Sequence, residues 1–505
     1  MRISVVKNIA ATMSAKIWMA GLQLFFAPVY LFFLGPTSYG LLGFYSSLLL
    51  SLAFLDQALS PVLSRELARI SAGDGGADQA RSMLLTFELL SCAVAVALGL
   101  AIWYLGPYIA SHWIRDDSLS EERLTFIVRL MGITIACHWP TFLYNAGFVG
   151  LQRQDTAMRL RIVTASIQWA GAALVLWALR PEVELFFFWQ VITLALTSLV
   201  MRVGLWRLMP FSPNVSTFNL KKLRPVIPFA AGSLAIGLTG SLLTQVDKLL
   251  VAKYASLDQL AGYSLCFLAA SLLSAFVSQP VSSGLLPLFV NLISTKNEQR
   301  LAVEYHLWTQ CVAVVAFPVT AALIFFPNAL AYVWLPSNSP INELVTDLIP
   351  WIAAGTLFNV LCTFPYVLQM AAGRTKLLLF KNILTLTVVL PILVYFMPDY
   401  GPVIGAYCWL AVNVSYYLLE APIMHCQLLK GELRKWWLND TLSPGIFVGT
   451  IFIAADAVFP NQSGWGLVAL ATGTALISMA LLVVCLRGPR LKLLDMLNKK
   501  DSASQ

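Results

Sequence analysis

Apolar runs of about 20 residues recur along almost the whole of this 505-residue chain. A run of that length crosses the hydrocarbon layer of a bilayer as an α-helix, whereas a barrel strand needs only about half as many residues. The runs therefore predict an all-α fold of transmembrane helices. We place fourteen spans near residues 10–33, 39–63, 83–106, 124–149, 160–179, 185–205, 227–252, 259–284, 302–326, 344–370, 377–397, 402–425, 441–459 and 465–486.

The scarcity of charge supports the same prediction. Hydrophobic residues make up 58% of the chain and charged residues 11%, whereas a soluble domain carries about 25% charged residues. A chain this long with so few charges cannot cover itself with a polar surface. It is predicted to be an integral membrane protein. The first apolar run has no small-residue cleavage site, which favours a span over a signal peptide.

Lysine and arginine are distributed unevenly between the predicted loops. If the N-terminus is cytoplasmic, the opposite side of the membrane holds only Arg115, Arg123, Arg180 and Lys253. Because cytoplasmic loops of membrane proteins carry an excess of Lys and Arg, both termini are predicted to be cytoplasmic. This asymmetry also accounts for the net charge of +8, so the charge does not indicate a nucleic-acid partner.

Short matches at a nearly constant spacing indicate an internal repeat. Thr141-Phe142-Leu143-Tyr144 returns as Thr363-Phe364-Pro365-Tyr366, about 222 residues later. Two further pairs have nearly the same sequence separation: Arg153 with Arg374, and Gly40 with Gly262. The spacing predicts two homologous halves with six spans each.

Because six is an even number, the two halves enter the membrane in the same sense, and the axis that relates them runs along the membrane normal. The predicted domains are an N-terminal six-helix bundle at 1–205, a cytoplasmic linker at 206–224, a C-terminal six-helix bundle at 225–430, and two additional helices with a basic tail at 431–505.

No pattern in the chain predicts catalysis, a cofactor or a metal site. Most of the eight cysteines lie inside apolar runs and none forms a Cys-x-x-Cys pair, so buried apolar packing is the favoured interpretation. The four histidines are scattered without ligand spacing, and no nucleotide-binding loop is present.

Ionisable residues inside the apolar spans are the candidate functional residues. A charge at the bilayer centre costs roughly 2.5–3.5 kcal/mol, so such residues usually face a cavity or a partner. The basic candidates are Lys16 in the first span, Arg129 in the fourth and Lys248 in the seventh. Each could instead extend its side chain to the membrane surface.

The acidic candidates are Asp56 in the second span, Glu88 in the third and Asp247 in the seventh. An intramembrane carboxylate can bind a proton or a cation, so these residues are candidates for ion coupling. The alternatives are structural: Asp56 could pair with Lys16, Glu88 could be hydrated near the membrane edge, and Asp247 could neutralise Lys248.

Several short motifs together resemble a known family. Leu34-Gly35-Pro36-Thr37-Ser38-Tyr39-Gly40 is similar to the LGPxxYG pattern of Wzx-type polysaccharide flippases, in the multidrug/oligosaccharidyl-lipid/polysaccharide exporter superfamily. The order and spacing of four further segments extend this resemblance from the first span to the twelfth. These segments are Gly150–Gln154, Gln245–Leu250, Gly373–Lys376 and Asp399–Ala406.

The resemblance implies a transporter, not an enzyme, that moves an undecaprenyl-pyrophosphate-linked oligosaccharide from the cytoplasmic to the periplasmic leaflet of a bacterial inner membrane. A cationic residue in a central cleft would then hold the pyrophosphate. Lys16 is the first candidate because the family often places a basic residue in the first span, and Arg129 and Lys248 follow. A polysaccharide polymerase and a chain-length regulator are candidate partners.

Two alternatives remain open at this stage. One is a cation-coupled multidrug exporter of the same superfamily, which would expose acidic residues in its cavity. The other is a lipid II-type flippase, because the thirteenth and fourteenth spans resemble the additional helix pair of those proteins.

Overall fold

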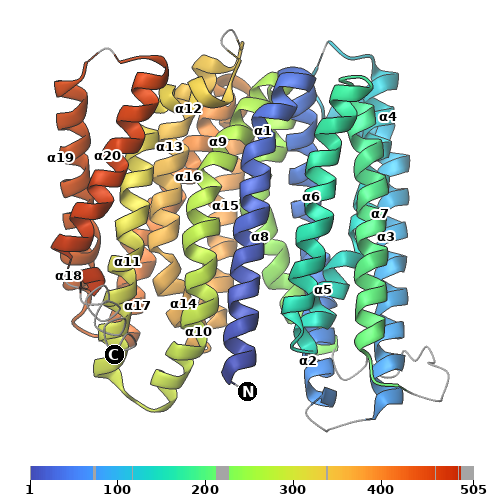
Figure 1. Cartoon of the computed structure of the whole chain (residues 1–505), viewed down its shortest axis with the longest axis horizontal. Coiled ribbons are helices and arrows are strands. Elements are labelled where there is room, and N and C mark those ends of the chain that lie inside the picture. The colour runs from blue at the N-terminus through green and yellow to red at the C-terminus, as the bar shows by residue number, and fades with distance from the viewer. Residues whose placement is uncertain are drawn as a thin grey trace, which may run out of the picture. The chain divides into compact units, whose positions relative to one another are not determined.

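The computed structural model describes residues 2–71, 76–116, 118–211, 227–336, 339–460, 462–486 and 488–490. Most of the predicted linker at 206–224 lies outside these ranges, as does the end of the basic tail. Within them the secondary structure is helical throughout. The all-α membrane fold predicted from the apolar runs is therefore confirmed (Figure 1).

Most of the helices follow one another with short connections (Figure 1). In chain order they are α1 (Arg2–Leu52), the 3-10 helix η1 (Ala53–Ala58), α2 (Ser60–Ser71), α3 (Ala77–His112), α4 (Glu121–His138), α5 (Pro140–Gly150), α6 (Gln154–Ala178), α7 (Val183–Leu208), α8 (Ile227–Tyr254), α9 (Leu257–Leu273), the π-helix η3 (Ser274–Ser278), α10 (Gln279–Ser294), α11 (Glu298–Phe325), α12 (Pro327–Trp334), α13 (Asn342–Leu361), α14 (Thr363–Ala371), α15 (Thr375–Tyr400), α16 (Pro402–Ser415), the π-helix η4 (Tyr416–Glu420), α17 (Ala421–Leu428), α18 (Leu433–Lys435), the π-helix η5 (Trp436–Leu442), α19 (Ser443–Val458) and α20 (Gly464–Cys485).

Eleven helical stretches in the described residues are long and apolar enough to cross a membrane. The longest of them, Ser14–Ser71, covers most of the first predicted span and all of the second. Helix α8 coincides with the seventh span, and α9 with α10 coincides with the eighth. Each of the fourteen predicted spans thus falls on helical backbone.

The first two predicted spans are separated by a local break at Gly35. This residue adopts φ 76° and ψ 169°, a backbone conformation that is open only to glycine. Pro36 follows and cannot donate a backbone hydrogen bond, so the helical ladder is interrupted where the sequence placed a turn.

The internal repeat is visible in the backbone at the ends of α5 and α14. Gln152 and Gly373, 221 positions apart, both have positive φ (55° and 71°). The same hydrogen bonds close both ends: Arg153 N–H donates to Phe148 O and Arg374 N–H to Gln369 O, while Gln152 N–H donates to Val149 O and Gly373 N–H to Met370 O. This is the Schellman ending of a helix.

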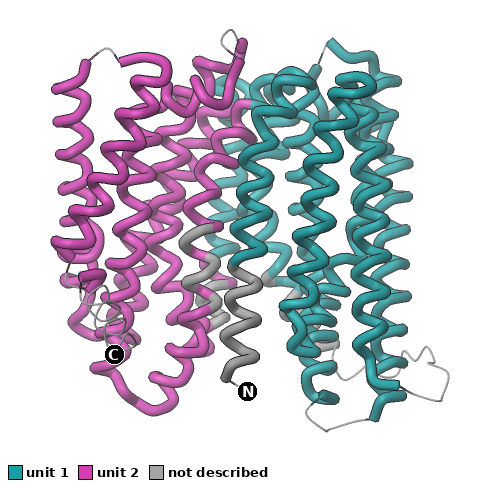
Figure 2. The backbone as a smooth tube through the Cα atoms, in the orientation of Figure 1, with its two compact units in different colours: residues 1–261, 382–401 teal, residues 262–381, 402–505 magenta. Residues whose placement is uncertain are grey.

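The described chain divides into two compact units, shown in Figure 2. Unit 1 comprises residues 1–261 and 382–401, and unit 2 comprises 262–381 and 402–505. This division groups residues by contact, whereas the predicted boundaries at 205, 225 and 430 rest on the sequence repeat. Those boundaries stay a prediction.

Each unit has its own apolar core. In unit 1, Leu63, Phe87 and Phe148 are fully buried where α2, α3 and α5 meet. In unit 2, a larger cluster centres on Tyr305 and Trp436. A second cluster in unit 2 packs Phe452 of α19 and Ala471 of α20 against α11, and this cluster holds the last two helices in place.

Candidate functional site: basic side chains of unit 1

Helices α1 and α6 of unit 1 pack side by side and bring basic groups together. Trp18 Nε1 donates a hydrogen bond to Ser166 Oγ (3.0 Å), and Tyr30 OH donates to the Trp169 carbonyl (2.6 Å). Along this contact Lys16 of α1 is partly buried. Arg161 on α6 lies near enough for its positive charge to act on the Lys16 ammonium.

His138 at the end of α4 joins the same group, because the charge of Arg161 acts on its imidazole as well. Its ring stacks on Phe142 with centroids 5.2 Å apart. Its Nδ1 atom is buried and has no hydrogen-bond partner in the described part of the chain. An imidazole nitrogen left in this way can donate a proton to an incoming acceptor.

Three helices thus each contribute one basic side chain to a cluster: Lys16 from α1, Arg161 from α6 and His138 from α4. In the described ranges Arg161 forms no ion pair with a carboxylate. Like charges placed together in a low-dielectric region are costly unless an anion is present. The arrangement suits an anionic group such as a phosphate, which accepts hydrogen bonds from Lys and Arg.

The other two basic candidates have different surroundings. The Arg129 guanidinium lies over the Trp103 ring, 5.0 Å from its centroid, and Nε is 3.4 Å from the Trp103 carbonyl oxygen. Lys248 donates to the Thr244 carbonyl at 2.9 Å and lies 3.4 Å from Asp247. The predicted alternative, in which Asp247 and Lys248 neutralise each other, agrees with this geometry.

Asp56 lies in η1, the 3-10 segment between α1 and α2, and its side chain is buried. Ser60 donates its hydroxyl proton to this carboxylate. The segment packs against α8, where the Cα of Gly237 faces Gln57 so closely that a methyl group would contact Gln57 at 2.8 Å. Asp56 is thus held at a break in regular helix, a common setting for ion binding in membrane proteins.

Glu88 of α3 is enclosed by donors from two other helices. Tyr144 OH of α5 donates to Oε1 at 2.8 Å, Trp206 Nε1 of α7 donates to Oε2 at 3.0 Å, and Arg202 of α7 forms an ion pair with Oε1. With its charge compensated and its oxygens occupied, this carboxylate joins three helices. The predicted hydrated edge position does not describe it.

A similar carboxylate lies in unit 2. Glu420 accepts hydrogen bonds from Gln369 Nε2 (3.0 Å) and from Lys381 Nζ (2.8 Å), and the Lys381 ammonium lies 4.1 Å from the centroid of the Tyr416 ring. Lys381 and Arg161 lie close to the start of the predicted spans at 377–397 and 160–179. Both lie inside helices, since α15 and α6 begin before the apolar runs that predicted them.

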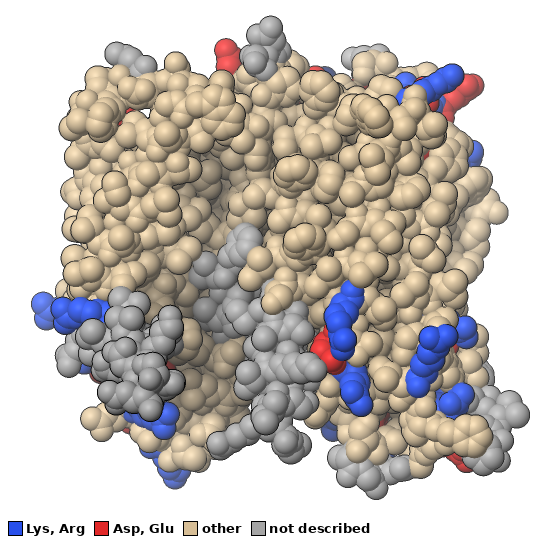
Figure 3. All heavy atoms as spheres, in the orientation of Figure 1, with Lys and Arg blue, Asp and Glu red and all other residues tan. Residues whose placement is uncertain are grey.

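Figure 3 shows that on its visible face the Lys, Arg, Asp and Glu side chains lie toward the helix ends and leave a wide uncharged band.

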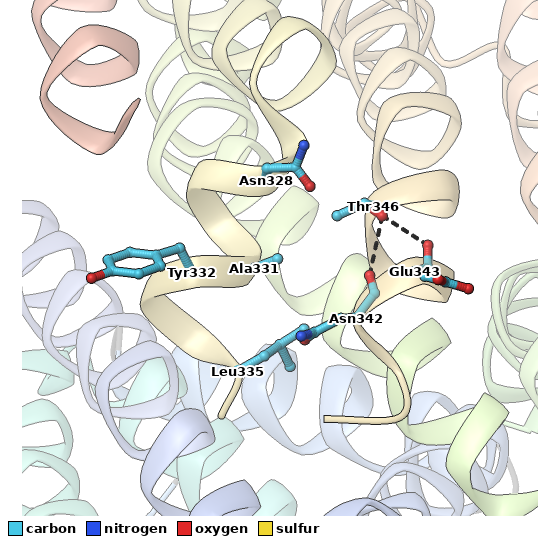
Figure 4. Close-up of a pocket in the computed structure, with 7 residues that line it drawn as sticks. All are labelled: Asn328, Ala331, Tyr332, Leu335, Asn342, Glu343 and Thr346. Atoms are coloured by element: carbon cyan, nitrogen blue, oxygen red, sulfur yellow. Dashed lines mark hydrogen bonds between the residues drawn. The ribbon is translucent and has the colours of Figure 1, made fainter. Parts of the chain in front are cut away.

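A pocket of about 310 Å³ lies between α12 and α13, where Asn328, Tyr332 and Glu343 line it (Figure 4). Its polar groups are few, and Thr346 Oγ1 already donates to the Glu343 carbonyl at 2.9 Å.

Residues 33–338 match the family described as polysaccharide biosynthesis protein. The chain belongs to this family. No match to this chain was found among curated proteins. The family assignment confirms the resemblance found in the sequence motifs.

Solved structures with the same fold come from the superfamily suggested by those motifs. The lipid II flippase MurJ, in an inward closed conformation, matches this chain with a TM-score of 0.72 at 12% identity, over 95% of this chain and 99% of MurJ. A multidrug resistance MATE family transporter, inward-facing, matches with a TM-score of 0.64 at 14% identity, over 83% and 96% of the two chains.

A third match is a MOP superfamily transporter from Pyrococcus furiosus, described as having a binding pocket of reversed polarity (TM-score 0.58, 14% identity, 83% and 94% coverage). At these identities the likeness concerns the fold. Together with the eleven apolar helical stretches in the described residues, it indicates a multi-pass membrane protein with a transporter fold.

Proposed function

We propose that this protein moves an undecaprenyl-pyrophosphate-linked oligosaccharide, such as an O-antigen, capsule or exopolysaccharide repeat unit, from the cytoplasmic to the periplasmic leaflet of a bacterial inner membrane. It acts as a transporter and not as an enzyme, and both termini face the cytoplasm. The observation that carries the proposal is the basic cluster of Lys16, Arg161 and His138 inside the membrane helices of unit 1.

The chemistry of the cargo explains why such a cluster is useful. A sugar hydroxyl that loses its hydrogen bonds costs about 4–8 kcal/mol in hydrocarbon, so the head group needs a polar path. A pyrophosphate needs positive charge as well, which Lys16 and Arg161 supply. His138 Nδ1 adds a third donor when the imidazole is protonated there.

Transport by the purified protein in vesicles tests the proposal, with a fluorescent undecaprenyl-pyrophosphate glycan as cargo. Lys16→Ala and Arg161→Gln should each lower the rate by about 10–100-fold, since a hydrogen bond to a charged group contributes about 1.5–3 kcal/mol. Lys16→Arg should retain most of the rate because it keeps the charge.

Arg159→Gln is the matched control. Arg159 lies two residues before Arg161, but its side chain is 71% exposed and pairs with Asp155 at 2.7 Å. Its replacement should leave transport near the wild-type rate. If Lys16→Ala and Arg161→Gln transported as fast as Arg159→Gln, the basic cluster would not be the pyrophosphate site.

Of the three acidic candidates for ion coupling, Asp56 is preferred over Glu88 and Asp247. In the described part of the chain the Asp56 carboxylate is paired with the Ser60 hydroxyl and with no basic side chain, whereas Arg202 neutralises Glu88 and Lys248 neutralises Asp247. Asp56→Asn should reduce the response of transport to an imposed proton or sodium gradient, and Glu88→Gln should not. An unchanged response in Asp56→Asn would remove it from this role.

The second candidate is a cation-coupled multidrug exporter, for which the buried Asp56 carboxylate is the favouring observation. A lipid II-type cargo would use the same basic cluster. Vesicle transport of an organic cation, of lipid II and of the glycan-linked lipid separates the three. A polymerase and a chain-length regulator are the proposed partners of the glycan transporter.

A further inference from the structure

His306 of α11 lies between two carboxylates from the segment that leads into α19. Its Nδ1 atom contacts Asp440 of η5, and its Nε2 atom lies 3.0 Å from Glu432 Oε2, just before α18. Asp440 is almost completely buried, with a side chain that is 1% exposed. This arrangement links α11 of unit 2 to the beginning of the last helix pair.

The two contacts need two protons between them. A carboxylate oxygen can only accept a hydrogen bond unless it is protonated, and a neutral imidazole carries one N–H. With a neutral ring and two ionised carboxylates, one nitrogen would face an oxygen with no proton between them. The geometry therefore requires one proton more than the neutral ring supplies.

The neighbouring groups keep both carboxylates in place as acceptors. Gln310 Nε2 donates to Asp440 Oδ1 at 2.8 Å, and Gln310 Oε1 accepts from the Gly488 backbone. Lys435 donates to Glu432 at 3.1 Å and holds the pKa of Glu432 below its usual range. Glu432 is consequently an anion at neutral pH.

The remaining titratable groups around His306 do not supply the missing proton. His425 of α17 uses Nδ1 to donate to the Ala421 carbonyl at 2.7 Å, and Tyr305 meets the His306 ring edge-on. A polar pocket of about 1040 Å³ borders His306, with Glu298 and Lys430 also in its lining, so protons and water can reach the site.

We propose that His306, Asp440 and Glu432 form a proton-binding site that fastens the last two membrane helices to α11. When the proton is bound, both carboxylates have a donor and the segment before α19 stays docked. When it leaves, one carboxylate loses its donor and the segment opens into the pocket. This inference does not depend on which cargo the protein carries.

Hydrogen–deuterium exchange of the full chain in nanodiscs, read on peptides that cover 436–460 and corrected for the intrinsic exchange rate, tests the site. Because the docked state holds one more proton than the open state, its opening constant should rise by up to about tenfold per pH unit between about pH 6 and pH 9. Peptides from α3 should not show this rise.

Substitution of Glu432 separates a proton site from simple packing. In Glu432→Gln the amide can donate to Nε2 while Nδ1–H donates to Asp440, so a neutral ring satisfies both contacts. The pH dependence should disappear while protection at low pH is retained. His306→Gln should lose protection at every pH, and His306→Lys, with its permanent charge over this range, should keep more of it.

The matched control is His112→Gln, at an exposed histidine at the end of α3, which should behave as wild type. The proposal is overturned if the wild-type opening constant is independent of pH, or if Glu432→Gln keeps the full pH dependence. It is also overturned if His306→Gln is as protected as wild type. A variant that fails to fold does not affect the wild-type and Glu432→Gln measurements.

Discussion

The Thr37 hydroxyl donates a 2.6 Å hydrogen bond to the Asp258 carboxylate. The two residues are 221 positions apart in the sequence, which is the spacing of the internal repeat. Thr37 follows the break at Gly35 in α1, and Asp258 lies in the first turn of α9. Equivalent points of the two sequence copies thus touch each other. Nearby, Gly40 approaches Leu257 so closely that a Cβ would lie 2.2 Å from its carbonyl oxygen.

The first prediction concerns this close approach. Gly40→Ala should lower stability by about 1–3 kcal/mol, because the added methyl group meets a backbone atom that cannot rotate away. Gly21→Ala, in the same helix with nothing within 4 Å of its Cβ position, is the control and should be neutral or slightly stabilising. Thermal unfolding in detergent measures both. Equal midpoints for the two variants would contradict the close contact.

The second prediction compares the two tyrosines of the sequence repeat. Tyr144→Phe should cost about 1.5–3 kcal/mol, because its hydroxyl donates to the buried Glu88 carboxylate. Tyr366 is the equivalent residue, 43% exposed, and its hydroxyl has no hydrogen bond in the described ranges. Tyr366→Phe should therefore leave the unfolding temperature unchanged. A larger loss for Tyr366→Phe than for Tyr144→Phe would count against the Glu88 contact.

The third prediction isolates backbone strain. Gly373 has φ 71°, and an added Cβ there would meet nothing within 4 Å. Gly373→Ala should thus lose roughly 1 kcal/mol from backbone conformation alone. Gly449→Ala in the middle of α19 also enters open space, but without positive φ, and it should not destabilise. Chemical unfolding curves of the two variants decide the matter, and a stable Gly373→Ala would refute the positive φ.

The fourth prediction concerns the ion pair between Lys381 and Glu420, whose side chains are 20% and 10% exposed. Single replacements by Met and Gln should each destabilise, and the double variant should cost less than their sum, with a coupling of about 1–3 kcal/mol. The exposed pair Arg180–Glu182, 3.8 Å apart, should give a coupling below about 1 kcal/mol. Equal coupling free energies for the two pairs would show that burial of Glu420 does not strengthen its interaction with Lys381.

The membrane fold could be predicted because span length and charge asymmetry depend on local sequence alone. The places where helical geometry changes could not be predicted. The 3-10 helix η1 around Asp56 and the π-helices at 416–420 and 436–442 differ from α-helix by one residue in the spacing of their hydrogen bonds, and apolar runs do not encode this difference.

The candidate site was predictable only in part. Lys16 stands out because a charge interrupts an apolar run, but Arg161 and Lys381 lie near run ends where a loop assignment is equally consistent with composition. Partners such as Tyr144 for Glu88 are set by packing between distant helices. The repeat drew attention to Tyr144 but carried no information about its partner.

The paired helix endings at Gln152 and Gly373 show that one backbone shape is built with two different residue types. Gly373 suits the left-handed turn, whereas Gln152 holds the same turn at an energetic disadvantage. The two corners therefore share one backbone geometry, although only Gly373 adopts it without strain, and a glycine at position 152 would relieve that cost.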